Sequence, residues 1–278
     1  MVDLHTHTYE SDGTDSPSGL IDKAAAAGIT TLAITDHDTF TAHLVAQARA
    51  AELGIRLIHG VEISTKARNR GVHLLAYWFH PPVPEAFELW LSQMLEYRKE
   101  RNRQLAVRLR SLGLDIEVAE AEALGRTITG RVHFAKVLIA KGYVKSINEA
   151  FNKYIGEDAP GFVLMEDPKT SDAIRKVREF GGVPVLAHPI RLGMKDLDVE
   201  EAFIKEQVEA GLLGLEVMHS DHDEIARARY MALVGRYGIS PSGGSDFHGD
   251  IKPKVLLGRG VSGNVSVPQA WVDKLASL

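Results

Sequence analysis

Histidines and carboxylates, the residue types that bind hard and borderline metal ions, recur along this chain beside short apolar runs. His5 and His7 are separated by one residue, and in a strand such residues point to the same face, so they could hold one ion between them. The further candidates are Asp12, His37, Glu62, His73, His188, Asp246 and His248. One pair alone carries little information, but imidazoles and carboxylates spread over the whole chain indicate a multinuclear metal site.

The elements that must position these residues alternate between apolar runs and helical patterns, which is typical of an α/β fold with a parallel sheet. Strands are predicted at 2–5, 31–35, 56–62, 72–79, 183–187, 213–218 and 239–241. Helices are predicted at 17–28, 42–53, 84–113, 130–142, 171–180, 199–210 and 224–237, one after nearly every strand. The pattern favours a distorted (β/α) barrel, formed by residues 1–98 and 166–278, with a helical insertion at 99–165 that caps the active site. A doubly wound open sheet is the alternative.

Nearly all the candidate ligands follow the end of a predicted strand. In (β/α) barrels the active site lies at the carboxyl ends of the strands, so these side chains should converge at one mouth. His73 is the exception, because it opens its apolar run and should lie too low unless the strand starts earlier or bends inward. His43, His59 and His80 are interpreted as hydrogen-bonded structural residues.

Composition restricts the function classes. The 278 residues are 45% hydrophobic with a net charge of -5, which argues against a duplex-DNA binder. Cysteine is absent, so thiolate metal sites are excluded and a reducing compartment is expected. We expect a cytoplasmic protein, because the sequence shows no signal peptide and no apolar stretch long enough for a membrane span. No obligate protein partner is evident.

The insertion differs from the rest of the chain in charge. Between Arg98 and Met165 there are 12 Lys/Arg and 8 Asp/Glu, a net of +4, against -9 for the remainder. One interpretation of Arg101, Arg103, Arg108 and Arg110 is a solvated helical surface. The other is a basic cap facing a site that binds anions.

Arg131 and His133 stand in the first turn of a helix that we expect to begin after Thr129-Gly130. Cations are disfavoured there because the helix dipole is already positive, so a bound phosphate is indicated. The alternative is an arginine that reaches back to a carboxylate. Arg191, just after His188-Pro189, is a second phosphate-binding candidate.

The motifs taken together resemble the PHP family, named for its polymerase-associated and histidinol-phosphatase members. The resemblance covers nearly the whole chain and rests on Asp3-Leu4-His5-Thr6-His7, Ser11-Asp12-Gly13, Ile34-Thr35-Asp36-His37-Asp38-Thr39, Gly60-Val61-Glu62-Ile63-Ser64, His73-Leu74-Leu75, Ala187-His188-Pro189 and Gly244-Ser245-Asp246-Phe247-His248. It implies a distorted (β/α)7 TIM-like barrel with a trinuclear metal centre. It further implies three ligand sets: His5, His7, Glu62 and Asp246 for the first metal; Glu62, His73 and His188 for the second; Asp12, His37 and His248 for the third.

The insertion indicates which branch of the PHP family the chain resembles. Thr129-Gly130-Arg131-Val132-His133-Phe134-Ala135 and Asn152-Lys153-Tyr154 are similar to a bacterial branch of nucleotide phosphoesterases, which includes 3′,5′-nucleotide bisphosphate phosphatases and 5′-3′ exoribonucleases. Relatives tend to carry Gly-Lys after the tyrosine, whereas Glu157-Asp158 follows Gly156 here, so no phosphate role transfers to a lysine there. A helix-turn-helix DNA binder is a weaker alternative for the insertion.

The expected activity is hydrolysis of the 3′-phosphate of nucleoside 3′,5′-bisphosphates to give the 5′-nucleotide. The nucleophile would be a metal-bridging hydroxide, and two to three divalent ions are expected, with Mn favoured over Fe or Zn. The leaving alkoxide needs an acid, for which Asp36, His219 and His222 are all open candidates. The alternatives are a 5′-3′ exoribonuclease on short RNA, a histidinol-phosphate phosphatase and a non-catalytic, metal-stabilised module.

Overall fold

A computed structural model describes residues 1–68, 70–125, 127–164 and 167–278. One sheet dominates it, and its seven strands lie side by side in chain order. The strands are β1 (Val2–Asp3), β2 (Thr31–Ile34), β3 (Arg56–Ala67), β4 (Arg70–Trp78), β5 (Val183–Leu186), β6 (Gly214–Met218) and β7 (Ser240–Gly243). A small second sheet joins β8 (Val255–Leu256) to β9 (Gly260–Val261).

The sheet curls into a nearly closed barrel, as the sequence predicted. The segment after β1 pairs with the segment after β7: Asp246 N donates to His5 O at 2.9 Å, and His7 N donates to Phe247 O at 2.9 Å. Helices pack against the strands because each buries an apolar face there. They are α1 (Pro17–Ala26), α2 (Thr41–Glu52), α7 (Thr170–Glu179), α8 (Leu197–Glu209), α9 (Glu224–Tyr237) and α10 (Gln269–Ala276).

A buried carboxylate fastens the two ends of the barrel to each other. Asp3 accepts hydrogen bonds from the backbone N–H groups of His5 (3.3 Å), Ser245 (2.8 Å) and Gly258 (2.7 Å), and from the Ser245 hydroxyl (2.5 Å). Its side chain is fully buried, and these donors compensate the loss of water. The first strand is thereby held against chain more than two hundred residues downstream.

The expectation of a parallel sheet is wrong at β4, within a barrel that is otherwise as expected. This strand runs antiparallel to both β3 and β5, and it follows β3 through a hairpin instead of a helix. β3 is also longer than expected, extending to Ala67. Because β4 is reversed, its first residues lie where the parallel strands end, so His73 reaches the same mouth as the other candidates. His73 was expected too far from the mouth because its strand was assumed to run parallel to its neighbours.

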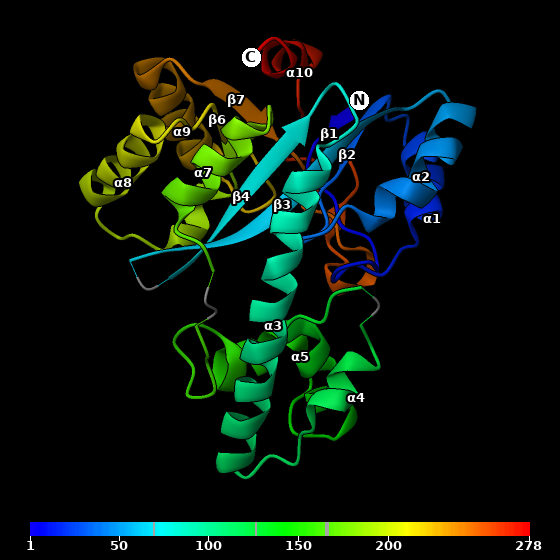
Figure 1. The fold of residues 1–278 in the computed structure, drawn as a ribbon, viewed down its shortest axis with the longest axis vertical. Helices are drawn as coiled ribbons and strands as arrows, with labels where there is room; N and C mark the ends of the chain where they lie inside the picture. Colours follow the sequence, from blue (N-terminus) through cyan, green and yellow to red (C-terminus); the bar gives the residue numbers. More distant parts are fainter. Residues whose placement is uncertain (69, 126, 165–166) are drawn as a thin grey trace.

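The insertion begins on α3 (Glu85–Ser111), which runs from the barrel into a separate helical lobe (Figure 1). The lobe also contains α4 (Val118–Glu122), α5 (Arg131–Ala140), α6 (Ile147–Ala150) and the π-helical turn η1 (Phe151–Ile155). It has its own apolar cluster, which includes Leu105, Leu109, Phe134 and Leu138. The expected boundary at 98/99 lies inside α3, and the one at 165/166 lies outside the described residues, so the domain division stays a prediction. No helix in the described chain is long and apolar enough to cross a membrane.

Candidate metal centre

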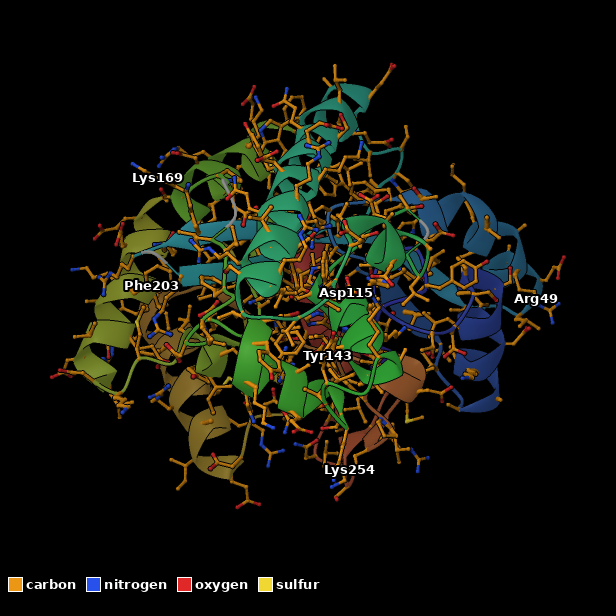
Figure 2. All side chains as sticks on the ribbon, turned by 90° about the horizontal axis from the view of Figure 1, so that it is seen from below. Arg49, Asp115, Tyr143, Lys169, Phe203 and Lys254 are labelled. Carbon is orange, nitrogen blue, oxygen red and sulfur yellow. The ribbon has the colours of Figure 1, made fainter. Side chains whose placement is uncertain are left out.

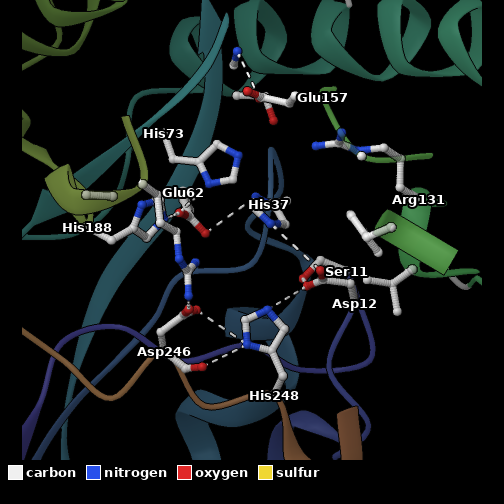
Figure 3. Close-up of a pocket in the computed structure, with 18 of the residues that line it drawn as sticks. Ser11, Asp12, His37, Glu62, His73, Arg131, Glu157, His188, Asp246 and His248 are labelled. Carbon is white, nitrogen blue, oxygen red and sulfur yellow. Dashed lines mark hydrogen bonds and ion pairs between the residues drawn. The ribbon is translucent and has the colours of Figure 1, made fainter. Parts of the chain in front are cut away.

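The candidate ligands of the sequence come together at one mouth of the barrel, and Figure 3 shows seven of the nine. These seven line a cavity of about 860 Å³ between the barrel and the helical lobe: Asp12, His37, Glu62, His73, His188, Asp246 and His248. His5 and His7 do not line the cavity but contact Glu62. His5, His7, Glu62, His188, Asp246 and His248 are buried, so their polar atoms are shielded from bulk water. Convergence of six separate chain segments on one point is the arrangement that the strand-end argument predicted.

Glu62 is the centre of the cluster. Its Oε1 lies 2.8 Å from His73 Nδ1 and 2.9 Å from His188 Nε2. Its Oε2 lies 3.2 Å from His5 Nε2 and 3.1 Å from His7 Nε2. One carboxylate that places each oxygen against a different pair of imidazoles has the geometry of a bridge between two ions.

Two other carboxylates complete the cluster. Asp246 Oδ1 lies 3.5 Å from His5 Nε2 and 3.4 Å from His7 Nε2. Asp12 faces His248 Nε2 at 3.3 Å and His37 Nε2 at 3.9 Å. Contacts also cross between the three sets that the resemblance implied, such as His37 Nδ1 to Glu62 Oε2 at 3.5 Å, so the assignment of ligands to individual ions stays a prediction.

The cluster fits divalent ions by the chemistry of its donors. His5 Nε2 and His7 Nε2 are buried and have no hydrogen-bond partner among the described residues, although carboxylate oxygens surround them. Burial lowers the pKa of His7, but the adjacent carboxylates of Asp246 and Glu62 outweigh it and raise the pKa to about 9. The site therefore attracts positive charge at this point, as a metal site does.

Three other histidines of the cluster are suited to binding as neutral ligands. Burial lowers the pKa of His37 to about 3. Burial, reinforced by Arg191, holds the pKa of His188 well below its usual range, and burial together with Lys252 lowers that of His248. Their lone pairs are thus free at neutral pH, which is the form that coordinates Mn, Fe or Zn.

Glu216, which the sequence analysis missed, fixes two of the candidate ligands. Its Oε1 lies 3.0 Å from His5 Nδ1, and its Oε2 accepts from the backbone N–H of His188 at 2.6 Å. A carboxylate on the second ring nitrogen orients a metal-binding histidine and strengthens it as a ligand. The available signal was an acidic residue inside the apolar run of β6.

The phosphate-binding candidates are placed differently from one another. Arg131 begins α5 and lines the cavity, where its guanidinium donates to Ile155 O at 3.3 Å. The ring of His133 instead caps its own helix, because Nδ1 accepts from the Gly130 N–H at 2.9 Å. Arg191 lines the cavity but is ion-paired, with Nη2 2.6 Å from Asp221 and 2.9 Å from Asp246.

The three candidate proton donors do not line the cavity within the described chain. Asp36 accepts from the Ser11 and Thr8 hydroxyls at 2.5 and 2.6 Å. His219 Nδ1 accepts from the Asp221 N–H at 3.0 Å, which leaves Nε2 to donate to Asp246 at 3.3 Å. His222 Nδ1 lies 2.8 Å from Val217 O.

Lys252 is a cavity-lining cation that the sequence analysis did not single out, and its Nζ lies 2.6 Å from Asp246 Oδ2. His43, interpreted as structural, lies 3.1 Å from the carbonyls of both Ile34 and Gly60. The cavity thus has cations on both sides: Arg191 and Lys252 lie beside the ligand Asp246, and Arg131 lies across from the cluster (Figure 3). Such a surface is suited to a phosphate ester, whose charge is spread over several oxygens.

Comparison with known proteins agrees with this chemistry. The PHP domain family matches residues 3–154. The chain is similar to a 3′,5′-nucleoside bisphosphate phosphatase from Chromobacterium violaceum, at 34% identity over 249 residues that make up 89% of this chain and 87% of that protein. It is also similar to a 5′-3′ exoribonuclease from Haemophilus influenzae, at 32% identity over 246 residues, or 88% and 89% of the two chains.

The fold has close counterparts among crystal structures. A protein described as a metal-dependent phosphoesterase, from Bifidobacterium adolescentis, matches with a TM-score of 0.86 and 29% identity, covering 99% of this chain and 95% of that one. Family, relatives and donor geometry therefore lead to one conclusion. The chain belongs to the PHP family and is a metal-dependent phosphoric ester hydrolase.

Proposed function

We propose that the protein removes the 3′-phosphate from nucleoside 3′,5′-bisphosphates and releases the 5′-nucleotide. The observation that carries this proposal is the two-walled cavity, with the histidine and carboxylate cluster on one side and Arg131 on the other (Figure 3). A substrate with two phosphates would place one at each wall. The similarity to the Chromobacterium bisphosphate phosphatase supports the same substrate class.

The cluster would hold two to three divalent ions, with Mn the favoured metal, on His5, His7, Asp12, His37, Glu62, His73, His188, Asp246 and His248. Bound there, the ions would act as Lewis acids on the phosphate and lower the pKa of the attacking water. The protein's own contribution is to fix the ligands and the substrate. Arg191 and Lys252 flank Asp246 and offer N–H donors at the edge of the reacting phosphate.

Arg131 would hold the 5′-phosphate. Its guanidinium sits at the start of α5, 5.5 Å from the ring of Phe151 and 5.4 Å from that of Phe162. This packing limits its rotation, so little conformational freedom is lost when it binds an anion.

Substitution of Arg131 tests the anchoring role. Arg131→Ala is expected to raise KM for a nucleoside 3′,5′-bisphosphate by roughly 10- to 100-fold, the effect of losing hydrogen bonds to a charged group. KM for p-nitrophenyl phosphate, which has no second phosphate, should change little. Steady-state kinetics with both substrates measure this, and an equal loss on both would refute the anchor.

A 5′-3′ exoribonuclease is the second candidate, because a relative with that name matches nearly as well. Incubation of the purified protein with a 5′-phosphorylated oligoribonucleotide distinguishes the two. Release of mononucleotides faster than phosphate release from the bisphosphate would make RNA the preferred substrate.

A further inference from the structure

Arg101 on α3 is a buried cation with unused hydrogen-bonding capacity. The residue lines the cavity with only 7% of its surface exposed. Its Nε and Nη2 have no hydrogen-bond partner in the part of the chain that the structure describes. It is thus neither the solvated surface arginine of one sequence interpretation nor a member of an internal ion pair.

Arg98, three residues earlier in the same helix, has the hydrogen-bond and ion-pair partners that Arg101 lacks. Its guanidinium binds the Asp38 carboxylate and the Ser64 hydroxyl, the latter at 2.8 Å. These contacts satisfy the Arg98 guanidinium inside the protein. Arg101 has no carboxylate within ion-pair distance among the described residues.

The surroundings of Arg101 favour an anion. Burial lowers its pKa, the nearby guanidinium groups of Arg98 and Arg131 lower it further, and the carboxylates of Asp167 and Asp38 offset this only in part. An uncompensated charge in such a place destabilises a folded protein, and a bound anion removes that cost. The N–H groups of a guanidinium match phosphate oxygens better than any other side chain does.

We propose that Arg101 is a specificity-determining residue that binds the non-reacting phosphate of the substrate, on the cavity wall that also carries Arg131. The proposal rests on the proposed function to the extent that it requires a substrate with two phosphates. Arg131 supplies one side of this subsite and already gives one N–H to Ile155 O. Arg101 supplies free donors, so it discriminates between esters with and without the second phosphate.

The test compares Arg101→Met with Arg103→Met in the metal-loaded full chain. Arg103 lies on the same helix, its side chain is 60% exposed, and it pairs with Glu100 at the surface. Each variant is assayed on a nucleoside 3′,5′-bisphosphate, the nucleoside 3′-monophosphate and p-nitrophenyl phosphate. Arg101→Met is expected to raise KM for the bisphosphate by roughly 10- to 100-fold and to leave both monophosphates unchanged. Arg103→Met should match the wild type.

A stability measurement separates binding from a structural role. Methionine removes the uncompensated charge and keeps most of the volume, so the Tm of Arg101→Met without substrate should equal or exceed that of the wild type. If Arg101 instead served a water-bridged contact with Asp167, Tm would fall. A lower Tm with equal loss on all three substrates overturns the proposal.

Failure of the proposed function gives a different result. If the wild type prefers a sugar bisphosphate over nucleotides and Arg101→Met abolishes that preference, the nucleotide proposal fails and the role of Arg101 stands. If the wild type shows no preference for a second phosphate in any ester, both fail. If the wild type prefers nucleoside bisphosphates and Arg101→Met keeps that preference, only the role of Arg101 fails.

Discussion

His5 is held at one ring nitrogen and presents the other to carboxylates, and this explains how a flexible imidazole becomes a fixed ligand. Nε2 faces Glu62 and Asp246, while Nδ1 is fixed by the buried carboxylate of Glu216. The same carboxylate also holds the backbone of His188. A single residue outside the ligand set therefore positions ligands from two different strands.

We expect Glu216→Gln to weaken metal binding by about 10- to 100-fold, because the amide cannot supply the negative charge that strengthens His5 as a ligand. Competition with a chelator, followed by metal analysis, measures the affinity. Glu206→Gln, an exposed position on α8, is the matched control and should bind metal as the wild type does. Unchanged affinity in Glu216→Gln would mean that shape alone orients His5.

At the scale of the element, α3 connects the barrel to the helical lobe. Arg98, about midway along the helix, reaches back into the barrel and binds the fully buried carboxylate of Asp38. Burial opposes ionisation of Asp38, but Arg98 overcomes this and lowers the pKa of the carboxyl. The contact thus sets where the lobe sits above the cavity.

Arg98→Met should lower the free energy of unfolding by roughly 3–5 kcal/mol, because it leaves a buried carboxylate without its cation. The double variant Arg98→Met/Asp38→Asn should lose less, since both charges are gone. Urea denaturation of the two variants and the wild type gives the comparison. A single variant as stable as the wild type would show that the Ser64 contacts alone satisfy Asp38.

The elements differ in how far their structure could be predicted from the sequence. Local signals were sufficient for α1, where Ser16 caps the helix and Pro17 begins it, and for α9. The direction of β4 could not be predicted, because an apolar run has the same pattern whether its neighbours are parallel or antiparallel. The burial of Arg101 was equally hidden, since it depends on the lobe that packs beside α3. Both properties arise from contacts between distant segments.

For the molecule as a whole, removal of metal should lower the thermal stability, and this loss should increase with pH. Without a cation, protons on His7 offset the carboxylates, and its folded pKa of about 9 lies above the ordinary value of 6.5. Protonation of His7 therefore stabilises the fold fully below about pH 6.5, and this stabilisation is lost as pH rises through about 9. The chelated protein should therefore lose Tm over this range.

The metal-loaded protein should lack this loss, because bound ions replace the protons. Thermal denaturation of chelated and Mn-loaded protein from pH 6 to 9 tests the prediction, with activity restored on adding Mn. A Tm difference that stays constant or shrinks with rising pH would contradict it.

The closed barrel has a consequence for how the enzyme is made in the cell. His5 and His7 are synthesised more than two hundred residues before Asp246 and His248, and before the Gly258 N–H that secures Asp3. Until then the early histidines belong to an open half-barrel that cannot retain an ion through the full ligand set. Loading of the full site must consequently follow synthesis of the segment after β7, and truncation before Asp246 should abolish it even where most of the chain has folded.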